Sequence, residues 1–134
     1  MLAPGLEALR LTLHVLAASV WVGGQIVLMG LVGPSRRLGP EAPTVLARAF
    51  ARLAWPAYAV LVVTGLWNVS TFHWADQSTA WKTVLIVKIV IVAVAGLGAL
   101  LHSRATSRRA TAVWGSIAGT ASVAALVLGM LLAG

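Results

Sequence analysis

The stretch that decides the fold is residues 83–101, which read TVLIVKIVIVAVAGLGALL with Lys88 as the one charged residue. A helix of about 20 residues, rising 1.5 Å per residue, crosses the roughly 30 Å hydrocarbon core of a bilayer. The run therefore predicts a transmembrane helix. A lysine at that depth costs about 2.5–3.5 kcal/mol on insertion scales, so Lys88 needs a partner, a water-filled cavity or a route back to the interface.

Three further blocks of similar length contain no Asp, Glu, Lys or Arg: Leu11–Val32, Leu53–Phe72 and Ala110–Gly134. Backbone polar groups in lipid must be satisfied within a helix or a closed barrel, and the alternating segments of a barrel are absent from the sequence. We therefore predict an all-α integral membrane protein, an antiparallel four-helix bundle that forms a single domain over residues 1–134. The expected helices cover about 6–32, 44–70, 79–102 and 110–133. Gly33-Pro34-Ser35 is expected to end the first, and Thr44 to cap the second.

Composition narrows the class of protein. The chain is 60% hydrophobic and 10% charged, which is too little polar surface for a soluble domain of 134 residues. It has no cysteine, which excludes disulfides, thiolate metal sites, iron–sulfur clusters and thiol nucleophiles. The net charge is +7, but the arginines fall in short loops, where anionic lipid headgroups explain them better than nucleic acid does. The expected environment is the lipid bilayer of a bacterial inner (plasma) membrane, crossed several times.

The distribution of positive charge predicts the orientation. Loops 1 and 3, with the start of the second helix, carry seven arginines: Arg36, Arg37, Arg48, Arg52, Arg104, Arg108 and Arg109. The opposite side carries only Arg10 and Lys82. Cytoplasmic loops are enriched in Lys and Arg, so we predict that both termini and the 72–78 loop lie outside.

His14 and Lys88 are the two ionisable groups within predicted spans. Each lies seven or eight residues inside its helix, which corresponds to roughly 10–12 Å below the outer ends. His73 in the outer loop and Met130 near the end of the last helix are expected at the same side of the membrane. The sequence therefore predicts a polar site in the outer half of the bundle, with His14, Lys88 and Trp21 as the residues that bind a cofactor.

The helical repeat places Ala18, Trp21 and Gln25 on the His14 face, and the small residues leave room beside the imidazole. Imidazole and thioether groups suit copper, so His14, His73 and Met130 are the candidate metal ligands, with Met1 as a weaker one. Plainer interpretations exist. Lys88 alone could extend to the interface, and His14 could be a core histidine bonded to a carbonyl or to Asn68.

Several segments resemble the copper-resistance D (CopD) domain. The first is His14-Val-Leu-Ala-Ala-Ser-Val-Trp-Val-Gly-Gly24, in which a histidine, small residues, a tryptophan and a glycine pair follow one another. Thr64-Gly65-Leu-Trp-Asn68 looks like the family's Thr-Gly…Asn segment, and Leu85-Ile-Val-Lys88 looks like its Leu-Leu-x-Lys segment. The resemblance covers nearly the whole chain and implies a four-helix membrane unit that handles copper.

The chain is also similar to a related group, the HemJ-type protoporphyrinogen oxidases. That group pairs a histidine on the first helix with a lysine on the third and is associated with haem b, and His14 and Lys88 match those two positions. The Tyr-His pair expected soon after the lysine is missing here, and residues 17–24 are closer to the copper-resistance type.

Three hypotheses about function follow. The favoured one is a copper-binding or copper-transporting membrane protein, which implies a copper ion as ligand and no catalytic residue. The second is a haem b redox protein or a porphyrinogen oxidase, with His14 as an axial ligand and Lys88 near a carboxylate. The third is a structural subunit of a larger membrane complex or a homo-oligomer, for which Gly115-x-x-x-Gly119 provides a packing motif.

Overall fold

The computed structural model describes residues 5–134, and every regular element in that range is helical, which confirms the predicted all-α class. The first transmembrane-length helix comprises α1 (Gly5–Ala18), the π-helical turn η1 (Ser19–Gly23), α2 (Gly24–Ser35) and the 3₁₀ turn η2 (Arg36–Leu38). It is followed by α3 (Ala42–Ser70), the 3₁₀ turn η3 (Trp74–Asp76), α4 (Thr79–Arg104) and α5 (Arg108–Ala133).

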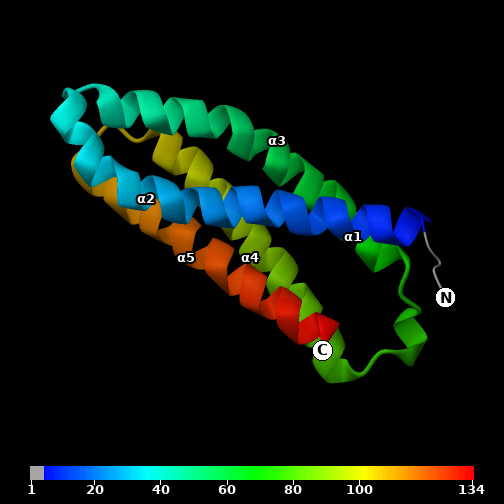
Figure 1. Cartoon of the computed structure of the whole chain (residues 1–134). Coiled ribbons are helices and arrows are strands. Elements are labelled where there is room, and N and C mark those ends of the chain that lie inside the picture. The colour runs from blue at the N-terminus through cyan, green and yellow to red at the C-terminus, as the bar shows by residue number, and fades with distance from the viewer. Residues whose placement is uncertain (1–4) are drawn as a thin grey trace. The chain divides into compact units, whose positions relative to one another are not determined.

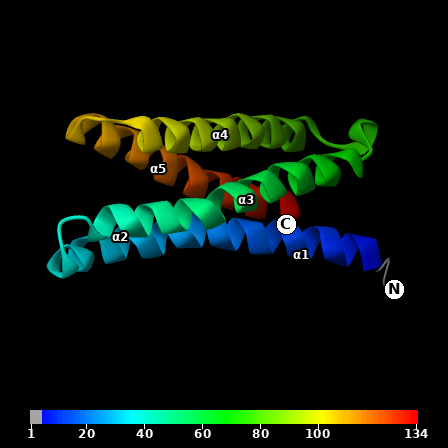
Figure 2. The same ribbon diagram turned by 90° about the horizontal axis from the view of Figure 1, so that it is seen from above.

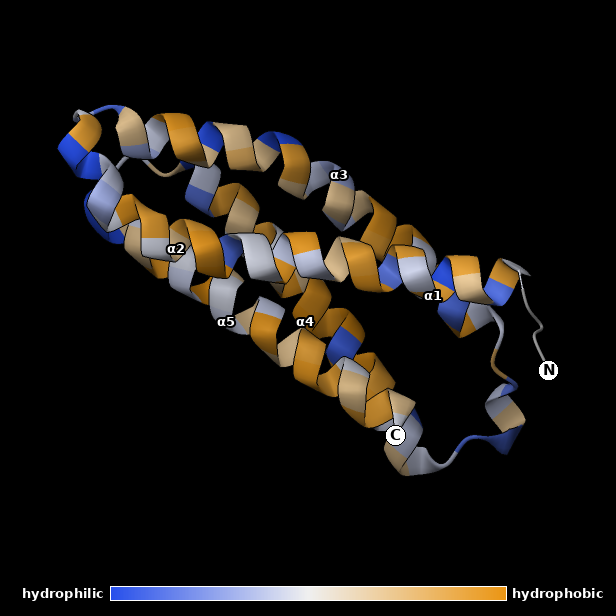
Figure 3. Cartoon of the chain, in the orientation of Figure 1, coloured by the Kyte–Doolittle hydropathy of each residue, from blue (hydrophilic) through white to orange (hydrophobic). Residues whose placement is uncertain are grey.

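Four helical stretches are long and apolar enough to cross a membrane: Gly5–Leu38, Ala42–Ser70, Thr79–Arg104 and Arg108–Ala133. Hydrophobic residues predominate along all four, and hydrophilic residues concentrate toward the helix ends (Figure 3). Many large apolar side chains remain exposed on the outer helix faces, including Val15, Met29 and Leu131. Such surfaces suit lipid rather than water, so the fold is compatible with a multi-pass membrane protein.

The chain divides into two compact units, with unit 1 ending at Phe72 and unit 2 covering His73–Gly134. In unit 1, α3 turns back beside α1 and α2; in unit 2, α5 turns back beside α4 (Figures 1 and 2). Each unit is thus an antiparallel helix pair. The prediction that the two pairs assemble into one four-helix domain stays a prediction.

The first helix continues past its expected end at residue 32. Its α-helical part ends at Ser35, within the predicted Gly33-Pro34-Ser35 segment, but Pro34 lies inside α2 and a 3₁₀ turn carries the helical path on to Leu38. Proline disfavours helical geometry in the preceding residue partly through a clash with that residue's Cβ, which Gly33 lacks. The turn comes instead at Gly39, whose φ of 140° is left-handed and suits glycine.

The second helix begins at Ala42 rather than at Thr44, with Pro43 in its first turn, where the missing N–H of proline is not needed. The helices expected over 79–102 and 110–133 agree with α4 and α5 to within two residues. Both begin at serine caps, because Ser78 accepts a hydrogen bond from Trp81 N and Ser107 accepts one from Ala110 N.

The contact zone between α1–α2 and α3 is called the unit 1 seam. Beside the buried alanines Ala17, Ala54 and Ala57, it contains polar and aromatic side chains: Arg10, His14, Trp21, Tyr58, Thr64 and Asn68. Trp21 is 5% exposed and lies in the π-helical turn. Its ring centroid is 4.7 Å from that of Tyr58 and 5.7 Å from that of Trp55. The Gln25 side chain donates a hydrogen bond to the Trp21 carbonyl at 2.9 Å, which ties the wide turn to the next one.

The contact zone between α4 and α5, called the unit 2 seam, is built from small residues. Ala95, Gly96 and Gly98 on α4 are buried, as are Ala118 and Ala121 on α5. A Cβ added to Gly98 would lie 3.1 Å from the Ala118 backbone nitrogen, so the two backbones approach closely there. The Gly115/Gly119 motif does not make this close contact between the two backbones. A Cβ added to Gly119 would meet nothing within 4 Å.

Candidate functional site in unit 1

His14 lies at the unit 1 seam against two consecutive residues of α3. Its Nδ1 atom is 2.8 Å from Thr64 Oγ1. A Cβ added to Gly65 would lie 3.5 Å from His14 Cε1, so the imidazole ring rests against the glycine surface. The hydrogen bond to the Thr64 hydroxyl was not among the partners expected for a core histidine, which were a carbonyl or Asn68. The Thr64-Gly65 segment therefore has a physical role, which is to hold the His14 ring.

The surrounding hydrogen bonds define which ring nitrogen carries the proton. The Thr64 hydroxyl has one proton, and the Val60 carbonyl oxygen, at 2.6 Å from Oγ1, can only accept. Thr64 therefore donates to Val60 and accepts from His14 Nδ1–H. In this tautomer the lone pair of the neutral ring is on Nε2. Histidines that bind metals usually donate their other ring N–H to an oxygen in this way.

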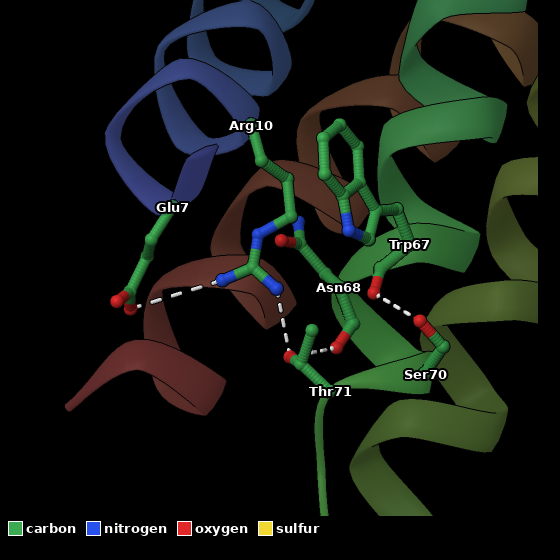
Figure 4. A network of polar contacts seen from close by, with 6 residues as sticks. All are labelled: Glu7, Arg10, Trp67, Asn68, Ser70 and Thr71. Atoms are coloured by element: carbon green, nitrogen blue, oxygen red, sulfur yellow. Dashed lines mark hydrogen bonds and ion pairs between the residues drawn. The ribbon is translucent and has the colours of Figure 1, made fainter. Parts of the chain in front are cut away.

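Arg10 lies one helical turn before His14 and is only 7% exposed. Its Nη1 donates a 2.7 Å hydrogen bond to Thr71 Oγ1, and that hydroxyl donates to the Asn68 carbonyl at 2.7 Å (Figure 4). Glu7 lies on the outer side, with its Oε1 atom 3.8 Å from Arg10 Nη2. From the sequence, Arg10 was expected only to contribute positive charge on the outer side. The signal that could have identified it was its i−4 spacing from His14, which places both on one face.

Two buried polar atoms in this network lack a hydrogen-bond partner within residues 5–134: Arg10 Nε and Asn68 Oδ1. An unpaired buried donor or acceptor costs about 1–3 kcal/mol, and more when it is charged. Buried polar atoms in native proteins are rarely left unpaired, so each needs an explanation. The Arg10 end of the seam therefore has hydrogen-bonding capacity that the described side chains do not use.

Trp21, the third predicted cofactor-binding residue, packs against Tyr58 and Trp55. Trp55 and Tyr58 also contact one another, with ring centroids 5.9 Å apart. The three rings form a packed cluster, in which Trp21 of η1 lies about two helical turns after His14. The arrangement gives Trp21 a clear packing role, and it leaves the predicted cofactor contact untested.

Lys88 belongs to unit 2, where it points toward α5. Its Nζ atom would lie 3.0 Å from a Cβ added to Gly129, so the glycine provides the space that the ammonium occupies. Within unit 2, no hydrogen-bond or ion-pair partner is found for this ammonium. Because His14 and Lys88 are in different units, their predicted pairing stays a prediction.

The other predicted copper ligands, His73 and Met130, are both exposed in unit 2. Met1 lies outside the described residues. No group of three His, Cys, Asp or Glu side chains suited to a metal ion occurs within residues 5–134. His102 is engaged elsewhere, because its Nδ1 is 2.7 Å from the Thr111 carbonyl oxygen near the α4–α5 turn. Within residues 5–134, His14 is half-buried at the unit 1 seam, whereas His73 and His102 are exposed.

The chain was compared with protein families, curated proteins and solved structures. No family model, no curated protein and no solved structure matches it. The resemblance to the copper-resistance D domain and to the HemJ-type group therefore stays a prediction from the quoted residues.

Proposed function

We propose that this chain is an integral membrane protein that binds haem b through His14. The observation that carries the proposal is the hydrogen bond between His14 Nδ1 and Thr64 Oγ1, because it fixes the orientation of the imidazole ring at the seam. A single oriented imidazole is enough for axial ligation of haem, whereas a metal ion held by protein alone needs several ligands. Haem b supplies a redox-active iron for electron transfer, tuned by its axial ligand and by burial.

The charge beside His14 supports haem over a bare copper ion. Arg10 and His14 are one turn apart, which places their Cβ atoms about 6 Å from each other. Like charges repel, and the repulsion is stronger at a partly buried seam than in water. A copper cation on His14 would meet this repulsion, offset only by the half-exposed Glu7. Haem carries two propionate groups, for which a buried guanidinium is favourable.

The proposal is tested by the absorption spectrum of the purified protein, with and without added haem. We expect a Soret band in the wild type, its loss in His14→Ala and its retention in the matched control His102→Ala, whose ring is bonded to Thr111. A wild type that takes up no haem, or a His14→Ala variant with an unchanged Soret band, contradicts the proposal. Circular dichroism of each variant separates loss of haem from loss of fold.

Lys88→Ala belongs in the same experiment, since the resemblance implies that this residue serves the same ligand. A shifted or weakened Soret band supports that role, and an unchanged spectrum assigns Lys88 to packing against Gly129 alone. If His14→Ala and Lys88→Ala both leave ligand binding and phenotype intact, the structural-subunit hypothesis replaces the haem hypothesis.

Copper handling is the second candidate, favoured by one observation in unit 2. His73 lies six residues before the start of α4 and Met130 three residues before the end of α5, so the antiparallel pairing places both at the same end of that unit. Imidazole and thioether together suit Cu(I). Competition with a coloured Cu(I) chelator tests this candidate: His73→Ala and Met130→Ala should each weaken copper binding, and His102→Ala should not.

The proposed arrangement in the membrane is an antiparallel four-helix bundle with both termini outside, in a bacterial inner membrane. The seven arginines expected on the cytoplasmic side are all exposed: Arg36, Arg37, Arg48, Arg52, Arg104, Arg108 and Arg109. Arg10, by contrast, is buried and bonded to Thr71, which makes the outer side still poorer in free positive charge.

The chain has no cysteine, so Ala75→Cys and Thr106→Cys can be labelled singly in intact cells. An impermeant maleimide should label position 75 and spare position 106; the reverse pattern contradicts the orientation.

A further inference from the structure

The unused hydrogen-bonding capacity of Arg10 lies on one edge of its guanidinium. Nη1 is bonded to Thr71 Oγ1, while Nε has no partner among residues 5–134. Glu7 approaches only Nη2, and its 3.8 Å distance is too long for a hydrogen bond. Nε and Nη2 together form the fork that binds a carboxylate through two parallel hydrogen bonds. The carboxylate-binding edge of a buried arginine is therefore only loosely occupied.

The guanidinium is held in place on its other side. Thr71 donates its hydroxyl proton to the Asn68 carbonyl, so it can accept from Arg10 without competition. These bonds anchor Arg10 to the C-terminal end of α3, where a positive charge also interacts favourably with the helix dipole. A structural brace of this kind explains the Thr71 bond. It does not explain why the Nε edge of a side chain that is 9% exposed remains unpaired.

Asn68 contributes a second unpaired group to the same network, its Oδ1 atom. A turn of the amide exchanges that acceptor for the Nδ2 donor, and coordinates of an amide do not by themselves distinguish the two orientations. Asn68 is one helical turn after Thr64, just as Arg10 is one turn before His14. The two helices run antiparallel, so the Arg10–Asn68 level lies directly outward of the His14–Thr64 level along the seam.

We propose that Arg10, assisted by Asn68, binds a propionate carboxylate of the haem whose iron His14 would ligate. The inference rests on the proposed function and adds a second, independent contact to it. The entering carboxylate takes the Nε–Nη2 edge and displaces Glu7, whose side chain is 57% exposed and free to turn into solvent. Arg10 is a binding residue in this scheme, and no chemical step is assigned to it.

The test changes the ligand as well as the protein. Binding of metal-free protoporphyrin IX and of its dimethyl ester is measured by fluorescence in neutral detergent, because neither ligand needs the bond between His14 and iron. Since a charge-assisted hydrogen bond is stronger than a neutral one, we expect the wild type to prefer the free acid by about 10- to 100-fold. Arg10→Gln should abolish the preference, and Arg10→Lys should keep part of it, since lysine has charge without the fork.

Glu7→Gln is the matched variant at the acidic residue that approaches the Nη2 atom of the same edge. Because Glu7 competes for the same edge, its removal should leave the preference for the free acid intact or increase it. A Glu7→Gln variant that loses the preference contradicts the scheme. A wild type that binds acid and ester equally, or an Arg10→Gln variant that keeps the full preference, overturns the inference even if haem binding to His14 is confirmed.

The two proposals fail separately. If Arg10→Gln abolishes the preference while His14→Ala leaves the haem spectrum unchanged, the Arg10 contact holds and axial ligation by His14 is wrong. Absence of any porphyrin binding overturns both. Phosphatidylglycerol offers the other source of an oxyanion, so loss of the preference when this lipid is added would assign the Arg10 edge to a lipid phosphate and overturn the propionate assignment.

Discussion

Unit 1 and unit 2 are both antiparallel pairs of long apolar helices, but different kinds of contact hold them. The unit 1 seam joins its helices through Arg10–Thr71 and His14–Thr64 hydrogen bonds and through packed aromatic rings. The unit 2 seam joins α4 and α5 by close backbone approach at Gly98 and Ala118. Lipid provides no hydrophobic drive for helix association, so each seam must rely on packing or hydrogen bonds. Hydrogen bonds and aromatic rings are therefore prominent at the unit 1 seam, and close backbone packing at the unit 2 seam.

The largest expected effect comes from adding bulk to the unit 2 seam. Gly98→Leu should lower the free energy of unfolding in detergent by about 2–3 kcal/mol, because its side chain meets the Ala118 backbone. Gly119→Leu is the matched control, since a Cβ there meets nothing within 4 Å. Thermal unfolding followed by circular dichroism measures both. Equal effects at the two glycines would mean that α4 and α5 do not pack as described.

Removing the Thr64 hydroxyl tests the polar character of the unit 1 seam. Thr64→Val keeps the shape but leaves His14 Nδ1 without its acceptor, so we expect a loss of about 1–2 kcal/mol in stability. If His14 ligates haem, the same change should weaken haem binding about 10- to 100-fold. Thr83→Val is the control, because that exposed hydroxyl bonds only the Thr79 carbonyl of its own helix. A similar loss in both variants would contradict a special role for Thr64.

The aromatic part of the unit 1 seam should contribute a smaller amount. Trp21→Phe reduces the contacts with Tyr58 and Trp55, and we expect destabilisation by about 1 kcal/mol. Trp74→Phe serves for comparison, since Trp74 is 45% exposed and its ring centroid is 6.4 Å from that of Trp81. The midpoint of unfolding by denaturant, followed by near-ultraviolet circular dichroism, is measured for both variants. An unchanged midpoint in Trp21→Phe would exclude the cluster as a source of stability.

The smallest effect on stability is expected at Gly65. A Cβ there makes an ordinary contact of 3.5 Å with His14 Cε1, and replacing a glycine within a helix by alanine gains about 0.5–1 kcal/mol. Gly65→Ala should therefore be neutral or slightly stabilising in a thermal melt, whereas Gly98→Ala, which meets backbone atoms, should be destabilising. If Gly65→Ala weakens haem binding without lowering stability, the ligand lies against the glycine. A clear loss of stability would contradict the ring position.

Most of the fold could be predicted because it depends on local properties of the chain. The uncharged runs predicted four helices of membrane-spanning length, and Ser78 and Ser107 mark the starts of α4 and α5. The ends of the first helix were harder, because Gly33 removes the clash by which Pro34 would disfavour helix. Pro56 lies inside α3 although Trp55 before it carries a Cβ, so a proline by itself does not mark the end of a helix.

The candidate site could be predicted only in part. His14 was identified because an ionisable residue in an apolar run is costly and therefore informative. Arg10 was missed because it lies at the edge of such a run, where a charge normally faces headgroups. The residues around Arg10 in the sequence do not show whether its side chain faces the headgroups or is buried against α3.

The sequence by itself determined the class of protein and the number of long apolar helices, because burial of backbone polar groups in lipid depends on the length and composition of each segment alone. Only the tertiary structure decided that Thr64 accepts from His14, that Arg10 is buried against Thr71 and that Gly129 makes room for Lys88. These contacts join residues distant in the chain. Their existence depends on how two helices are rotated and shifted against each other, which the periodicity of one helix does not specify.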